Sequence, residues 1–222
     1  RAYEPGHFNE PATGFAKAIE AAPSSATARV NLALTQLQLG NTAAAIVLLQ
    51  QAFELAPEDP NASREFVRAL LRAGRADDAI RVLGKSHSVN PDDEETVVSL
   101  AILLAQQNRI REAVTLLAES NQRFRERTAT ATTLARLLAS SPDRPVRDGQ
   151  RALDIAIAVH NMEPTPVHGE TIALALAELE RCEEALAQMR RAIAEAEQAN
   201  DAAEAMRLKS EMPKYEGGSC RQ

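Results

Sequence analysis

The sequence has little aromatic character: it contains no tryptophan, and aromatic residues make up 3% of its 222 residues. Hydrophobic residues nevertheless account for 45% of the chain, so its interior must be built mainly from Ala, Leu, Val and Ile. Ala and Leu are also strong helix formers. The composition therefore favours closely packed helices.

The sequence also has fewer basic than acidic residues: 25 are basic and 31 are acidic, which gives a net charge of −6. A net negative charge works against general attraction to a phosphate backbone. The sequence contains no run of 18 apolar residues, which a transmembrane helix would need. We therefore expect neither a nucleic-acid partner nor a membrane span.

Cysteine occurs only twice, at Cys182 and Cys220. The two residues could form a disulfide that fastens the C-terminal tail, which would imply an oxidising compartment. Alternatively, Cys182 is a small buried hydrophobic residue and Cys220 a free thiol in the tail. The sequence leaves both interpretations open. It contains no Cys-x-x-Cys-His motif, so no covalently attached haem is predicted.

What the sequence does contain is a repeat with a period of 34 residues. Four positions recur at this offset: Gly40 and Gly74, Ala45 and Ala79, Leu49 and Leu83, Pro57 and Pro91. A fixed period of this length indicates a solenoid of antiparallel helix pairs, none of which can bury its apolar face alone. We therefore expect one continuous array rather than separate domains.

The period divides the whole chain into units. We expect a partial repeat at 6–25, complete repeats at 26–59, 60–93, 94–127 and 166–199, an expanded repeat at 128–165, and a capping helix with a tail at 200–222. The expanded repeat carries five extra residues between its helices, since Ala135 and Ala152 are 17 apart where Ala33 and Ala45 are 12 apart.

Three smaller expectations concern single positions. Asn108 replaces the recurring glycine and can adopt the same left-handed conformation. The tail from Glu216 to Cys220 is expected to be loose. Because the chain begins with Arg1 rather than Met, we expect that a leader or another domain once preceded it.

The repeated positions resemble the tetratricopeptide repeat, whose 34-residue signature places small residues where the two helices touch. The matching small residues are Ala33, Ala45, Ala52, Ala79, Ala101 and Ala113. The Trp and Tyr of the fullest signature are absent. The resemblance implies an all-α fold, a right-handed superhelix of antiparallel helix pairs closed by a C-terminal capping helix. The expanded unit, with its loop at 140–149, resembles a variant common in bacterial arrays and so implies a bacterial origin.

In this family the first helix of each unit lines a concave groove that holds partner peptides. The resemblance assigns to this groove Asn31, Leu34, Arg64, Arg68, Arg72, Ile102 and Arg136. Arg64, Arg68 and Arg72 are four residues apart and so form one row along a helix. Because a guanidinium can donate two parallel hydrogen bonds to a carboxylate, one hypothesis is an acidic partner segment. The alternative is that these arginines are solvated or paired with Glu65 and Glu95.

Candidates for chemistry are few. His160 with Glu163, and His168 with Glu170, lie near one inter-helix turn and could gather a metal ion, although no ligand pair has the i, i+4 spacing of a helical zinc site. The alternative is ordinary turn polarity, and we predict no catalytic residue, metal or cofactor.

The predicted function is a non-catalytic scaffold that binds another polypeptide, or another domain of its own chain, in the concave groove. The alternative is a self-associating structural spacer or coat domain of a larger secreted protein. The compartment stays open, with the bacterial periplasm or the extracellular space favoured over the cytoplasm.

Overall fold

The structure is a computed structural model that describes residues 9–216 and Cys220. These described residues form twelve α-helices and two short 3-10 helices, with no strand. The predicted all-α fold is therefore confirmed. None of the helices in the described part is long and apolar enough to cross a membrane. Residues 6–8 of the expected partial repeat lie outside the described residues.

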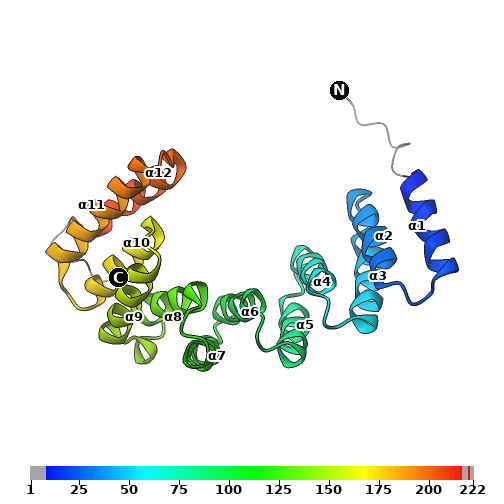
Figure 1. Cartoon of the computed structure of the whole chain (residues 1–222), viewed down its shortest axis with the longest axis horizontal. Helices are drawn as coiled ribbons and strands as arrows, with labels where there is room; N and C mark the ends of the chain where they lie inside the picture. Colours follow the sequence, from blue (N-terminus) through cyan, green and yellow to red (C-terminus); the bar gives the residue numbers. More distant parts are fainter. Residues whose placement is uncertain (1–8, 217–219, 221–222) are drawn as a thin grey trace. The chain divides into compact units, whose positions relative to one another are not determined.

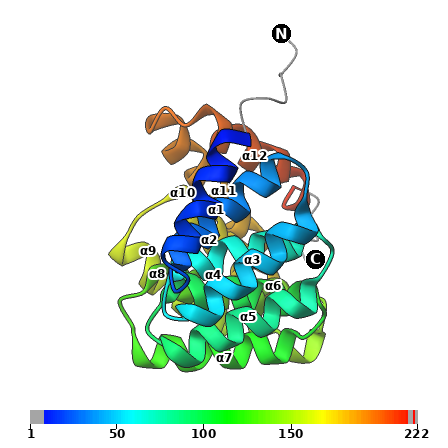
Figure 2. The same ribbon diagram turned by 90° about the vertical axis from the view of Figure 1, so that its right-hand side faces the viewer.

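The chain forms two compact units, residues 1–96 and 97–222. Unit 1 contains α1 (Asn9–Ala21), α2 (Ala26–Gln38), α3 (Thr42–Leu55), α4 (Pro60–Arg72), α5 (Ala76–Val89) and the start of α6 (Glu94–Gln106). Each of the first four helices packs against the next one in sequence (Figures 1 and 2). In Figure 1 α2 lies above α3, and α4 above α5, so α2 and α4 occupy the same side of this unit.

Unit 2 begins within α6. It then contains α7 (Ile110–Arg123), α8 (Thr128–Ser140), η2 (Arg144–Val146), α9 (Gly149–Met162), α10 (Pro166–Glu178), α11 (Cys182–Gln198), α12 (Ala202–Glu211) and η3 (Met212–Lys214). From α7 to α12 each α-helix again packs against its successor. The first helices of two successive pairs, α8 and α10, also contact each other directly. The side chains that α8 and α10 direct away from their second helices therefore lie next to each other.

Left-handed residues end the first helix of most pairs. Gly40 and Gly74 have φ angles of 81° and 71°, and Asn108 has the same conformation at 60°, as predicted. Glu180 takes this place in the last pair with a φ of 61°, which the sequence analysis did not identify. The reversal lets the N–H of Asn41 donate to the carbonyl of Gln36, which satisfies an orphan acceptor at the helix end.

Side-chain caps begin several helices. The carboxylate of Asp59 accepts a hydrogen bond from the backbone N–H of Asn61 at the start of α4, and the hydroxyl of Thr165 accepts one from His168 at the start of α10. Proline occupies the first helical position in both cases, where its missing N–H costs nothing. Asp201 caps α12, where its carboxylate accepts a hydrogen bond from the backbone N–H of Glu204.

Small residues fill the helix contacts, as the resemblance implied. The side chains with no exposed surface include all six matching alanines: Ala33, Ala45, Ala52, Ala79, Ala101 and Ala113. Leucines such as Leu49, Leu70 and Leu117 are likewise fully buried beside them. Interiors built this way are close-packed, so a volume change at one alanine is felt by the neighbouring helix.

The connection between α8 and α9 is longer than the others. Eight residues separate these helices, whereas three separate α2 from α3 or α4 from α5. Arg147 from this connection pairs with Glu178 of α10 at 2.9 Å, and both side chains are about a tenth exposed. The same guanidinium donates to the carbonyl of Ser141. The longer loop is therefore fixed against the end of α10.

Candidate functional site

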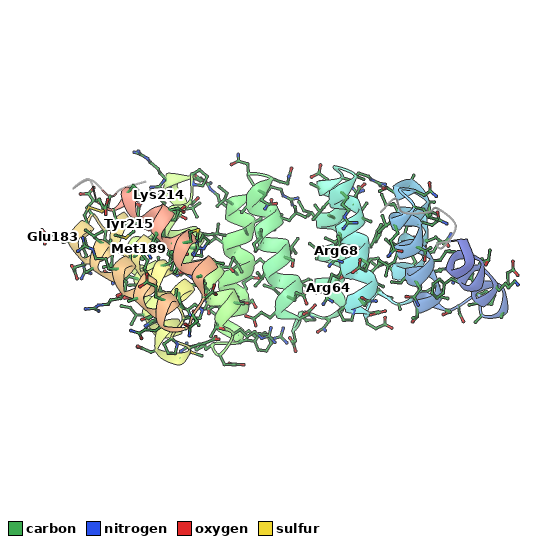
Figure 3. All side chains as sticks on the ribbon, turned by 90° about the horizontal axis from the view of Figure 1, so that it is seen from above. Arg64, Arg68, Glu183, Met189, Lys214 and Tyr215 are labelled. Carbon is green, nitrogen blue, oxygen red and sulfur yellow. A yellow bond between two sulfur atoms is a disulfide. The ribbon has the colours of Figure 1, made fainter. Side chains whose placement is uncertain are left out.

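In unit 1 the residues assigned to the groove lie on α2 and α4, which contact each other. Asn31 and Leu34 on α2 are half-buried, whereas Val30 beside them is 1% exposed and belongs to the core. Arg64, Arg68 and Arg72 on α4 are all exposed. Figure 3 labels the first two of these arginines on α4.

Two of the three arginines are already paired. Arg64 donates from Nη2 and Nε to the two carboxylate oxygens of Glu95, at 2.6 and 2.8 Å. The hydrogen bond to Glu95 and the charge of that carboxylate raise the pKa of Arg64. Arg68 pairs with the buried Glu65 at 2.8 Å. These are the carboxylates named in the alternative interpretation of the row.

Arg72 differs from the other two arginines. It is exposed in the last turn of α4 and has no ion-pair partner among the described residues. An incoming carboxylate could therefore bind it without displacing a partner that the protein already holds.

The surroundings of Arg64 are acidic. A cavity of about 350 Å³ in unit 1 lies between the residues that precede α4 and those that precede α6. Its lining includes the carboxylates Glu58, Asp92, Asp93 and Glu95, with Arg64 as its one basic residue in the described part of the chain. An acidic segment would meet like charge here, so the N-terminal end of α4 is a poor place for it.

In unit 2 the two remaining residues assigned to the groove, Ile102 and Arg136, differ in their exposure. Ile102 on α6 is 44% exposed, as a groove position would be. Arg136 on α8 is half-buried because it donates to Glu170 of α10, with Nη1 and Oε2 2.7 Å apart. Arg136 is therefore engaged within the protein rather than open to a partner.

Glu170 is the centre of a charge cluster that joins three helices. Arg207 of α12 donates two further hydrogen bonds to it, both of 3.0 Å, one to each carboxylate oxygen. The Glu170 side chain is 6% exposed. Burial acts to raise the pKa of Glu170, but the hydrogen bonds and charges of Arg207 and Arg136 outweigh it, and the pKa lies below its ordinary value. The carboxylate therefore stays ionised while buried.

Two of the described residues after α12 are buried, and one of them, Cys220, lies 3.9 Å from the carbonyl oxygen of Ala177 in α10. Tyr215 is 3% exposed, and burial together with the charges of Glu170 and Glu211 raises the pKa of Tyr215 to about 12. Cys220 is 2% exposed and forms a disulfide with Cys182, the first residue of α11. The expectation of a loose tail is therefore wrong for Cys220. The bridge fixes Cys220 to the start of α11.

The capping helix α12 carries paired charges and one exposed apolar side chain. Glu204 pairs with Arg207, and Arg207 faces inward to Glu170. Met206, by contrast, is 71% exposed. It lines a cavity of about 500 Å³ together with Glu197, Ala202, Ala205 and other residues of α11 and α12.

The residues considered for a metal site do not assemble one. Within the described part of the chain, no three His, Cys, Asp or Glu side chains are placed to hold a metal ion together. The Nδ1 atom of His168 lies 2.5 Å from the carbonyl oxygen of Glu163, in the turn between α9 and α10. Glu170 is bound by two arginines instead. The turn residues thus serve local structure.

Comparison with known proteins agrees with this architecture. Residues 36–86 and 70–137 match a family model described as tetratricopeptide repeat (TPR). Among solved structures, the chain is similar to YrrB, described as a TPR protein with an unusual peptide-binding site. The two share 18% identity over 90% of this chain and 99% of that one, with a TM-score of 0.60.

Two further solved structures are similar over most of the chain. The thermophilic TPR protein TTC0263 from Thermus thermophilus has 20% identity, covers 84% of this chain and 98% of its own, and gives a TM-score of 0.57. MamA from Desulfovibrio magneticus RS-1, residues 41 to the end, has 14% identity, covers 80% and 97%, and gives 0.61. At these identities the likeness shows the fold. No curated protein matches the sequence.

Proposed function

Since the chain is a tetratricopeptide repeat protein, we propose that it is a non-catalytic scaffold that binds a partner polypeptide on the outward faces of its first helices. The observation that carries this proposal is the open face of α4. Arg64 occupies the repeat position that Glu170 occupies in α10, and its side chain is 44% exposed where that of Glu170 is 6% exposed. At this repeat position α4 therefore exposes a side chain that α10 buries.

The surface on α2 and α4 combines apolar and basic groups. Leu34 is half-buried and can contact an apolar side chain, while Arg72 offers a guanidinium that is not paired within the described residues. YrrB, which shares this fold, is described as having a peptide-binding site. We propose by analogy that a peptide segment lies across α2 and α4.

The three arginines of α4 differ in how easily a carboxylate of the partner can bind them. A carboxylate binds Arg72 directly, whereas it must replace Glu65 on Arg68 and Glu95 on Arg64. The Arg64–Glu95 pair is exposed on both sides and so contributes little and exchanges readily, whereas Glu65 is buried and holds Arg68 more firmly. The proposed acidic segment is therefore anchored at the C-terminal end of α4, away from the acidic cavity.

The test compares two triple variants with the same change in charge. Partners are recovered by cross-linking to the full chain and identified, and their affinity is then measured by calorimetry. Replacing Arg64, Arg68 and Arg72 by Ala removes up to three exposed ion pairs and should weaken binding about tenfold. Replacing Arg81, Arg190 and Arg191 on the second helices should leave it unchanged. A partner bound equally by all three proteins would show that the α4 row is not the binding surface.

A second candidate function is self-association through the last helix, and the exposure of Met206 favours it. Apolar side chains on the end of an array invite contact with another surface. Sedimentation velocity of the parent would then show mass rising with concentration, and Met206→Lys would abolish the rise. A parent that stays monomeric at high concentration would remove this alternative. The bacterial origin and the compartment stay predictions.

A further inference from the structure

The proposed function leaves the long connection between α8 and α9 unexplained. This connection, residues 141–148, contacts α7 through η2. The backbone N–H of its last residue, Asp148, donates to the carbonyl of Leu138 at 2.9 Å, and Arg147 is held by Glu178 as described above. Side chains on a loop that is fixed in this way keep constant positions, which is what a binding site requires.

A cavity of about 450 Å³ lies between this connection and the starts of α7 and α9. Its volume is in the range of pockets that hold small ligands. Arginines line it from three elements: Arg111 on α7, Arg147 in the connection and Arg151 on α9. They belong to a stretch, residues 109–151, that contains nine arginines and five acidic residues in a chain that is acidic as a whole. The cavity therefore lies in a basic part of the chain.

Two of these arginines can donate hydrogen bonds to a ligand. Arg151 is exposed, and among the described residues its guanidinium has no hydrogen-bond or ion-pair partner. Arg111 is 75% exposed and binds Asp143 through its Nε atom. Arg147 differs from both, because its guanidinium is held by Glu178 and its side chain is 11% exposed. Arg147 therefore positions the loop, while Arg111 and Arg151 are available to a ligand.

The carboxylates beside these two arginines leave room for an incoming anion. Asp148 also lines the cavity, but it caps α9 by accepting a hydrogen bond from the backbone N–H of Arg151, and the positive end of the helix dipole offsets part of its charge. Asp143 lies 3.3 Å from the Nε atom of Arg111, which is longer than a strong charge-assisted hydrogen bond. Because exposed ion pairs contribute little and exchange readily, an anion can replace Asp143 on Arg111.

The two available guanidinium groups determine the chemistry of the ligand. A phosphate monoester carries a charge of about −1.5 to −2 at pH 7 and three strong acceptor oxygens. Each guanidinium can donate two parallel hydrogen bonds, so two of them around one phosphate match both its charge and its oxygens. A carboxylate has one negative charge and two oxygens, which a single guanidinium already satisfies. The cavity therefore fits a phosphate group better than a carboxylate.

We propose that the cavity at the long connection is a phosphate-binding site, in which Arg111 and Arg151 bind the phosphate oxygens and Arg147 holds the loop in position. The five extra residues of the expanded repeat then form one wall of this site. The site belongs to unit 2 and does not depend on the peptide surface of α2 and α4. Failure of the arginine variants in unit 1 would therefore leave the tests below unaffected.

The first experiment measures the affinity of the full chain for inorganic phosphate by calorimetry at constant ionic strength. Combining Arg111→Ala with Arg151→Ala should weaken binding about tenfold or more, because both binding groups are removed. The matched control combines Arg190→Ala with Arg191→Ala, which removes the same charge from exposed positions on α11 and should leave the affinity nearly unchanged. Acetate should bind the parent about tenfold more weakly than phosphate, because it carries less charge and fewer oxygens.

The second experiment looks for a gain of affinity, which a misfolded variant would not give. Asp143→Asn removes the carboxylate that competes for Arg111, while the backbone N–H at this position can still donate to the hydroxyl of Ser141. The affinity for inorganic phosphate should rise several-fold. Asp154→Asn removes the same charge from an exposed position on α9 and should leave the affinity nearly unchanged.

A third measurement identifies the source of the phosphate group. A short peptide with one phosphoserine that binds more tightly than inorganic phosphate would assign the site to a modified side chain of a partner, whereas equal affinities would assign it to a free phosphate. The same peptide with unmodified Ser should not bind. The proposal is overturned if phosphate does not bind, if acetate binds as tightly, if both double arginine variants lose the same affinity, or if Asp143→Asn and Asp154→Asn have equal effects.

Discussion

Replacing Glu170 by Gln is expected to loosen the docking of α12 by about 2 kcal/mol. The carboxylate accepts hydrogen bonds from Arg136 and from both terminal nitrogens of Arg207. Gln keeps the shape but loses the charge and one of the two acceptor oxygens. A hydrogen bond to a charged group contributes roughly 1.5–3 kcal/mol, and the lower part of that range applies because both arginines are partly exposed.

The measurement is hydrogen exchange of the α12 amides, because the loss is local to the helix that Arg207 docks. At 1.36 kcal/mol for each factor of ten, about 2 kcal/mol corresponds to roughly 30-fold faster exchange wherever undocking limits the rate. Glu184→Gln is the matched control. Glu184 also binds one guanidinium through both oxygens, that of Arg181, but its side chain is 58% exposed. This control should leave exchange almost unchanged.

A double-mutant cycle completes the argument. If Glu170 acts through Arg207, the combined effect of Glu170→Gln and Arg207→Ala should fall short of the sum of the single effects by about 1 kcal/mol or more. Equal acceleration by Glu170→Gln and Glu184→Gln, or strict additivity in the cycle, would refute the view that this cluster holds α12.

Local and periodic features of the fold could be predicted from the sequence. The turn at Asn108 followed from its place in the period, because few residues besides Gly and Asn adopt a left-handed conformation easily. The buried alanines, such as Ala45 and Ala79, followed because small residues recur where two helices must approach closely. Such features depend on a few neighbouring residues, which the sequence displays directly.

The ion pairs between helices could be predicted only in part, since Glu95 was named as an alternative partner of the arginine row but Glu170 was not named as a partner of Arg136. The sequence shows the arginine row of α4 as one set, but pairing depends on which carboxylates the next helix brings close. A signal does exist, since Arg64 with Glu95 and Arg147 with Glu178 are both separated by 31 residues. Searching for opposite charges nearly one repeat apart would have found them.

Cys220 was misjudged because the composition around it suggests disorder while its own contacts are tertiary. Glycine and serine at positions 217–219 are typical of loose termini, and the sequence offered two interpretations of the cysteines. One charge that raises the pKa of Tyr215, that of Glu170, belongs to α10, more than 40 residues earlier in the chain. The one indication in the sequence was Tyr215 itself, because the chain has only two tyrosines and a large aromatic side chain favours burial.

Two further predictions test the charge cluster and the core separately. The pKa of Glu170 lies below its ordinary value, so its contribution to the docking of α12 is complete above about pH 4.5 and is lost as the pH falls through the lowered pKa. Hydrogen exchange of the α12 amides, corrected for the intrinsic effect of pH on exchange, should therefore become faster in acid in the parent. In Glu170→Gln the corrected rate should not change with pH. In the core, Ala45→Leu should lower the free energy of unfolding in urea by about 1–3 kcal/mol, because Ala45 has no exposed surface and added methyl groups in a well-packed interior force neighbouring side chains or backbone to shift. Ala44→Leu on the exposed side of the same helix should change it by less than about 0.5 kcal/mol. Equal losses in the two variants would mean that Leu is poorly tolerated along α3 in general, and that the small residues are not what brings neighbouring helices together.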